Sequence, residues 1–204
     1  LLRIIIECKI DIDLKELLDL AASNYPLKIK ANNITDDVFN FLMERLRRYY
    51  LDANVSNDTF ESVLAINTSR PLDFHHRLIA VTEFRKLAEA NSLAAANKRI
   101  SNILKQSDFN NVLEVKNNLL SEESEILLSE ALKEYQEKVV PMINDHDYKS
   151  ALTKLAGLGE SIDNFFDNVM VMCDDDNIKN NRLALLSNLN LLFLQTADIS
   201  KLQG

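Results

Sequence analysis

Residues that bend a chain are scarce in this sequence, which has 3 Gly, 3 Pro and no Trp among its 204 residues. A sheet protein needs many hairpins, and each hairpin needs turn residues with special backbone angles. The scarcity therefore argues against an all-β fold. Hydrophobic residues make up 47% of the chain, and a chain of this size buries roughly 70% of its unfolded surface. The composition favours an all-α fold.

Long apolar runs and paired cysteines are also missing. No run approaches the roughly 20 apolar residues needed to cross a bilayer, and no basic and apolar leader precedes the first predicted helix. Cys8 and Cys173 lie far apart and outside any Cys-x-x-Cys pair, which indicates reduced, structural thiols. These absences predict a soluble, cytoplasmic protein without a membrane partner. The start in mid-helix without Met indicates a fragment of a longer chain.

Positive charge is in deficit, since 23 Lys and Arg face 31 Asp and Glu and the net charge is −8. Such a chain does not bind nucleic acid indiscriminately, because phosphate neutralisation needs Lys and Arg. The charges are unevenly distributed: residues 107–176 hold 16 acidic and 5 basic side chains, whereas seven of nine arginines lie between Arg45 and Arg99. This distribution indicates either a local, arginine-based RNA footprint or two differently solvated faces of a helical protein.

Helical periodicity runs along most of the chain. Asp13 is predicted to begin a helix that stops before Pro26, because the residue before proline avoids helical angles. Thr35 is predicted to cap the next helix, with acidic residues in its first turn to complement the helix dipole. The predicted buried stripe of that helix consists of Val38, Phe39, Leu42, Leu46 and Tyr49.

Further helices follow, joined by short segments. Pro71 suits a first helical turn, and Ser121 is predicted to cap a long acidic helix. Pro141 must kink or end that helix, and Asp147 begins the next one. About eight helices without a fixed 20–50-residue repeat predict an all-α helical bundle.

Catalytic patterns are missing as well. The sequence has no Gly-rich phosphate loop and no Gly-x-Ser-x-Gly. His146-Asp147 is a pair found in metal-dependent phosphohydrolases, but the other histidines, His75 and His76, are adjacent. The acidic run 174–176 lacks the alternating ligands and glycine of a calcium loop and suits a helix N-terminus. We therefore predict no catalytic residue and no metal site, and a decayed or metal-dependent hydrolase remains a minor alternative.

Arginines and tyrosines gather in the helix that follows Thr35. Arg45, Arg47 and Arg48 place cations on more than one of its faces, and Tyr50 is predicted to lie nearer the edge of the apolar stripe than the buried Tyr49. Arginine pairs with phosphates or base edges, and an unstacked base can rest on an aromatic or guanidinium plane. The cluster predicts an RNA-contacting surface. The alternative is a packed tyrosine beside solvated arginines.

Other candidate RNA contacts lie farther along the chain. Arg70 stands at a helix start, where it can meet a phosphate together with first-turn amides or pair with Asp73. Lys98 lies nearly opposite an apolar stripe and is predicted to be exposed. The full candidate set for RNA binding is Arg45, Arg47, Arg48, Tyr50, Arg70, Arg77, Lys98 and Arg99.

A second set of residues is predicted to be structural. Asn97 lies on the shoulder of its helix's apolar stripe, where it can form a hydrogen bond within the fold. Arg182 is predicted to bridge to the acidic segment, which makes it a fold residue rather than an RNA contact. The predicted core positions near the end of the chain are Phe165, Phe166, Leu183 and Leu186.

Several segments of the chain resemble the corresponding segments of one protein family. They are Phe165-Phe166-Asp167, Val169-Met170-Val171, 181–186, 197–200, 69–77, 80–85, 94–104 and 41–50. Together they span most of 34–204 and resemble the C-terminal end of the β subunits of bacterial tetrameric glycyl-tRNA synthetases. The resemblance implies that residues 34–204 form an α-helical, DALR-type anticodon-binding domain, of the type shared with arginyl-tRNA synthetases. Residues 1–33 then form the helical segment that precedes it.

The resemblance implies a role in recognition rather than in chemistry. In that family the β subunit binds tRNA, and a separate α subunit activates glycine with ATP and Mg. The chain is thus expected to recognise the anticodon region of glycine tRNA without a cofactor of its own. Its expected protein partners are the remainder of the β subunit and the α subunit, in an α2β2 assembly. The alternative is an acidic helical scaffold for protein interactions that does not bind RNA.

Overall fold

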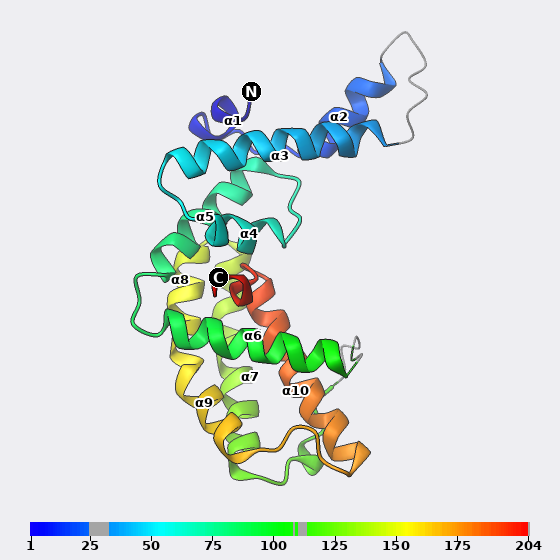
Figure 1. Cartoon of the computed structure of the whole chain (residues 1–204), viewed down its shortest axis with the longest axis vertical. Helices are drawn as coiled ribbons and strands as arrows, with labels where there is room; N and C mark the ends of the chain where they lie inside the picture. Colours follow the sequence, from blue (N-terminus) through cyan, green and yellow to red (C-terminus); the bar gives the residue numbers. More distant parts are fainter. Residues whose placement is uncertain (25–32, 108, 110–113, 204) are drawn as a thin grey trace.

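The computed structural model of the chain describes residues 1–24, 33–107, 109 and 114–203 (Figure 1). Over these ranges the chain is helical and contains no strand, which confirms the predicted all-α bundle. None of the helices in these ranges combines the length and apolarity that a bilayer crossing requires. The α-helices are α1 (Leu2–Glu7), α2 (Leu14–Ser23), α3 (Ile34–Asp52), α4 (Asn57–Leu64), α5 (Pro71–Phe84), α6 (Ala90–Gln106), α7 (Glu123–Asn144), α8 (Tyr148–Leu155), α9 (Gly159–Asn168) and α10 (Asp176–Leu194), and the 3-10 helices are η1 (Asn117–Leu119), η2 (Ala156–Leu158) and η3 (Ile199–Leu202).

The helices are arranged in layers along the long axis of the molecule (Figure 1). At one end, α2 packs on α3 and α1 packs on α5. Next come α4 and α5, and α5 packs against α8 of the main bundle. In that bundle α7 packs against α8, α9 and α10, and α6 crosses its middle. The arginine-rich helix α3 is thus part of a separate outer layer.

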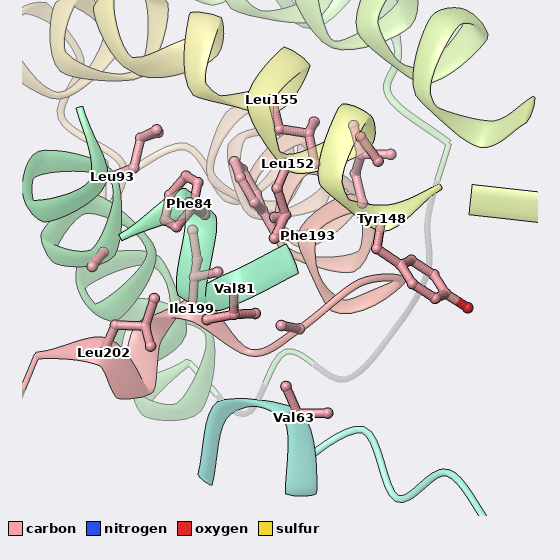
Figure 2. Packing of buried hydrophobic residues seen from close by; sticks show 14 of the residues in the cluster. Val63, Val81, Phe84, Leu93, Tyr148, Leu152, Leu155, Phe193, Ile199 and Leu202 are labelled. Carbon is pink, nitrogen blue, oxygen red and sulfur yellow. The ribbon is translucent and has the colours of Figure 1, made fainter. Parts of the chain in front are cut away.

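The C-terminal helix η3 closes the core. The backbone N–H of Asp198, the residue just before η3, donates a hydrogen bond to the Ser62 carbonyl at 2.9 Å. η3 packs on both α4 and α6. Each large apolar side chain removed from water contributes roughly 1.5–3 kcal/mol. Figure 2 shows Ile199 and Leu202 among buried side chains from four other helices, namely Val81, Phe84, Leu93, Leu152, Leu155 and Phe193.

Acidic side chains cap several helices. Asp13, Asp147 and Asp175 each accept hydrogen bonds from first-turn amides of α2, α8 and α10, which confirms the predicted starts. Negative charge at these positions also complements the positive end of the helix dipole. The run 174–176 is therefore a helix cap.

Two other predicted caps are wrong. The residue before α3 is Asn33, and Thr35 lies inside the helix, where its hydroxyl donates to Asp19 at 2.6 Å. α7 is capped by Glu122 instead of Ser121, because Glu125 three residues later completes a capping box with it. The buried Glu125 thus places the cap at Glu122, one residue after the expected serine.

Helix ends use asparagine where many proteins use glycine. Asn54 and Asn67, which follow α3 and α4, have φ of 62° and 57°, and Asn tolerates this left-handed conformation better than most residues. Pro141 lies in the last turn of α7, which ends three residues later at Asn144. A chain with 3 Gly can therefore still make sharp helix ends.

Candidate nucleic-acid interface

The outward face of α3 carries the most accessible arginines of the predicted set. Its buried stripe is Phe39, Met43, Leu46 and Tyr50, each 5% exposed or less. At 100° per residue, Phe41 and Arg48 point directly away from that stripe, and Arg45 lies about 50° to one side of them. The Arg45 guanidinium lies 5.2 Å from the centroid of the Phe41 ring, and Phe41 itself is 58% exposed. Arg48 is exposed and has no hydrogen-bond or ion-pair partner in the described part of the chain.

The two tyrosines of α3 have exchanged their predicted roles. Tyr50 is buried, and its hydroxyl forms a 2.7 Å hydrogen bond with His75 Nδ1, whereas Tyr49 is 37% exposed. Burial, together with the nearby Tyr49, raises the pKa of Tyr50. The prediction was wrong because the stripe continues from Leu46 by four residues rather than three. Tyr50 therefore has no free face for a base.

Arg47 holds α3 against α4. Its guanidinium pairs with Glu61, donates to Asn57 Oδ1 at 2.8 Å, and lies 4.7 Å from the Phe60 ring centroid. An arginine with this many partners must lose them before it can bind a phosphate. The geometry thus assigns Arg47 to the fold.

Arg70 and Arg77 are also committed to partners within the chain. Arg70 precedes α5, as predicted, but it pairs with Asp11 at 2.8 Å rather than with Asp73. Asp73 is instead taken by Arg77, one helical turn later, at 2.8 Å. The alternative Arg70–Asp73 pair does not form, because Asp11 comes from a segment distant in sequence, which helical spacing cannot reveal.

Arg77 is the centre of a buried network between α5, α8 and the end of α10. It donates to the carbonyls of Gln195 (2.5 Å) and Thr196 (2.9 Å) and to the Tyr148 hydroxyl (2.9 Å). The Tyr148 hydroxyl in turn donates to Asp73 at 2.5 Å. Burial alone would raise the pKa of Asp73, but the Tyr148 and Arg77 hydrogen bonds and the Arg77 charge lower it below its ordinary value. Arg77 is therefore unavailable to RNA.

The second accessible group of cations lies on α6. Lys98 and Arg99 are exposed: the Lys98 ammonium donates to the Gln203 carbonyl at 3.1 Å, and the Arg99 guanidinium lies 4.1 Å from the Phe166 ring centroid. Both contacts leave further donors free. Asn97, between these residues and the core, is 1% exposed and donates to the Leu93 carbonyl at 3.0 Å.

The closing signature of the chain is structural. Arg182 pairs with the fully buried Glu125 of the acidic α7 and donates to the Met170 carbonyl at 2.8 Å. This is the bridge to the acidic segment that the sequence suggested. Phe165, Leu183 and Leu186 are buried, and Phe166 packs at the edge of the core.

The acidic segment forms a surface unsuited to phosphate. A cleft of about 800 Å³ between the start of α6 and α8–α9 is lined by Glu89, Glu160, Asp163 and Asp167, with no lysine or arginine among its lining residues. Across the described ranges, no group of three or more His, Cys, Asp or Glu side chains is placed to hold a metal ion. His146, Tyr148 and Asp73 lie close together, but their contacts belong to the Arg77 network.

Phe41 is the surface residue that the sequence-based set omitted. Its spacing of four and seven residues from Arg45 and Arg48 was visible in the sequence. The burial of Tyr50, rather than Tyr49, places Phe41 on the outward face of α3.

Comparison with known proteins gives this geometry its context. The DALR anticodon binding domain family matches residues 93–199. The glycine–tRNA ligase beta subunits of Shewanella baltica (strain OS185) and Shewanella denitrificans are each 46% identical to the chain, over 202 and 203 residues, and that of Pseudoalteromonas translucida is 42% identical over 202. These matches cover 99–100% of this chain but 29% of each relative. The chain belongs to the DALR anticodon binding domain family.

Proposed function

We propose that this domain binds the anticodon region of glycine tRNA as part of a glycine–tRNA ligase beta subunit. The family match over residues 93–199 carries the proposal. The choice of glycine tRNA follows from the names of the relatives, which are glycine–tRNA ligase beta subunits. The family match and these names do not favour the alternative of an acidic scaffold without RNA binding.

Two groups of exposed cations are the proposed contacts. Arg45 and Arg48 are exposed on α3, where Arg45 contacts the exposed Phe41 ring. Lys98 and Arg99 lie on α6 within the matched region. Anticodon bases are single-stranded and can be splayed out, so they can stack on an aromatic or guanidinium plane while phosphates meet the cations. Tyr50, Arg47, Arg70 and Arg77 are left out because the fold already engages them.

The chemistry of the whole ligase is proposed to lie outside this chain. We assign ATP, Mg and glycine activation to the α subunit, with which the longer β subunit forms an α2β2 assembly in the cytoplasm. This chain then contributes binding energy and no catalytic group. Purified chain is accordingly expected to form no glycyl-tRNA when supplied with ATP, Mg and glycine.

Binding to an anticodon stem-loop tests the proposal. The chain is expected to bind the glycine stem-loop more tightly than one with a substituted anticodon, and the affinity is expected to fall as salt rises. Arg45→Ala with Arg48→Ala, and separately Lys98→Ala with Arg99→Ala, should weaken binding. Lys149→Ala, which alters an exposed lysine of α8 outside both groups, should not. Equal binding of both stem-loops, or no binding, would overturn anticodon recognition by this chain.

A further inference from the structure

Four large apolar side chains are exposed on two segments of the main bundle. Both segments lie at the end of the bundle farthest from α3 (Figure 1). Two lie in the first turns of α7 and two in the connection between α9 and α10. We name these four residues the apolar tip: Ile126 (41% exposed), Leu127 (46%), Met170 (74%) and Met172 (53%).

The methionines of the apolar tip are held outward by the fold. Val169 and Val171 are each 6% exposed, so buried and exposed side chains alternate along the connection, as in an extended strand. Arg182 fixes the segment by donating to the Met170 carbonyl while it pairs with the buried Glu125, the residue just before Ile126. The exposure of Met170 and Met172 is therefore a feature of the ordered structure.

The surroundings of the apolar tip are acidic. Glu122, Glu123, Asp167 and Asp174 are exposed and have no ion-pair partner among the described residues. Nearby cations are already engaged, since Arg182 pairs with Glu125 and Lys179 pairs with Asp176. A phosphate, an anionic membrane or a second copy of the same surface would bring like charges together.

We propose that the apolar tip docks a protein segment that presents apolar side chains flanked by Lys or Arg. Exposed apolar groups mark interaction surfaces, and methionine adapts to irregular pockets because its side chain is unbranched and polarizable. The acidic rim selects a basic partner through charge complementarity. This contact uses the end of the molecule away from α3, and it does not depend on the proposed RNA binding.

Methyl NMR tests the proposal on the intact chain. The chain has 4 Met, and Met43 is 5% exposed while Met142 packs at the edge of the core, so both serve as internal controls. The probe is an amphipathic peptide of Leu and Lys, with matched peptides in which Leu is replaced by Ser or Lys by Glu. We expect the Leu-Lys peptide, but neither matched peptide, to cause saturable shifts of the Met170 and Met172 methyl signals. The Met43 and Met142 signals should not shift with any of the peptides.

A variant pair provides the matched control. Met170→Ser with Met172→Ser should weaken peptide binding about tenfold or more, whereas Ile79→Ser, which alters a 45% exposed residue on α5, should leave it unchanged. Tip signals that do not move during binding, or equal binding of the Leu→Ser peptide, would overturn the proposal. So would tip signals that move with protein concentration alone, or on addition of the anticodon stem-loop. The wild-type spectra decide the question even if the double variant folds poorly.

Discussion

The arginines on the outward face of α3 and those in the bundle interior have the same side chain but differ in exposure and in their contacts. Arg45 and Arg48 are both exposed. Arg45 contacts the Phe41 ring, and Arg48 has no hydrogen-bond or ion-pair partner among the described residues. Arg77 and Arg182 have side chains only 12% and 8% exposed, and each joins elements far apart in sequence. The comparison shows that the number of partners inside the fold, rather than arginine content, separates an accessible arginine, which is a candidate RNA contact, from a structural one.

The largest effect is expected from Arg182→Ala. It leaves the charge of Glu125 buried without a partner, and the free energy of unfolding should fall by about 3–5 kcal/mol. Urea denaturation measures this change. Lys179→Ala, on the same helix but in a surface pair, should leave the denaturation midpoint nearly unchanged. Arg182→Met combined with Glu125→Gln removes both charges and should recover most of the loss. If Arg182→Ala were harmless, the interior arginines would not differ from the surface ones.

Asp73→Asn should have the next largest effect, a loss of about 1.5–3 kcal/mol, because charge-assisted hydrogen bonds to Arg77 and Tyr148 are weakened. The pH dependence has a defined sign. The pKa of folded Asp73 lies below its ordinary value of 3.8, so its stabilisation is complete above that pH and is lost as the pH falls toward the folded pKa.

Urea denaturation measured between about pH 5 and pH 2 checks this expectation. Asp73→Asn should flatten the acid limb of the stability curve, whereas the exposed Asp52→Asn should leave it in place. An unchanged limb in Asp73→Asn would assign the acid sensitivity to other carboxylates.

Tyr50→Phe should cost about 1 kcal/mol, because it removes one buried hydrogen bond to His75. Tyr49→Phe, at the adjacent exposed position, is the matched control and should cost nothing measurable. Thermal unfolding of both variants provides the measurement. Equal effects would restore the predicted burial of Tyr49.

His75 adds a pH signature to the same site. Burial, and then the charge of His76, lowers the pKa of His75 below its ordinary value of 6.5. The unfolded chain therefore takes up this proton first, so stability is complete above about pH 6.5 and falls as the pH drops toward the folded pKa. His75→Gln should reduce this loss, and His76→Gln should reduce it less.

The smallest effect on stability is expected for Arg48→Ala, within about 0.5 kcal/mol, while Arg47→Ala should cost about 1 kcal/mol through its lost contacts with Glu61 and Asn57. For RNA affinity the order should be reversed, with a larger effect of Arg48→Ala than of Arg47→Ala. Arg48→Ala should lower the salt dependence of stem-loop binding by about 0.7 in slope for one lost phosphate contact. A destabilised Arg48→Ala, or unchanged RNA affinity, would remove Arg48 from the interface.

The errors of the sequence-based predictions share a physical origin. Tyr49 and Tyr50 are adjacent, so each fits a helical stripe whose width exceeds the 100° between them. The ring contacts with Phe60, Phe74 and His75 on α4 and α5 select Tyr50. Arg70 has Asp73 within reach along the helix, yet Asp11 arrives from another segment. In both cases the deciding neighbour lies far away in the sequence.

The sequence by itself determined the all-α class, the starts of α2 and α8 at Asp13 and Asp147, the start of α10 at the acidic run 174–176, and the family of the chain. These features depend on local composition, on side chains that bond to amides within three residues, and on motifs in a fixed order. Tertiary structure alone decided which arginines are free, because burial and ion pairing are set by contacts such as Arg77 with Thr196 and Arg182 with Glu125. It also decided that Met170 and Met172 point outward while Val169 and Val171 fill the core.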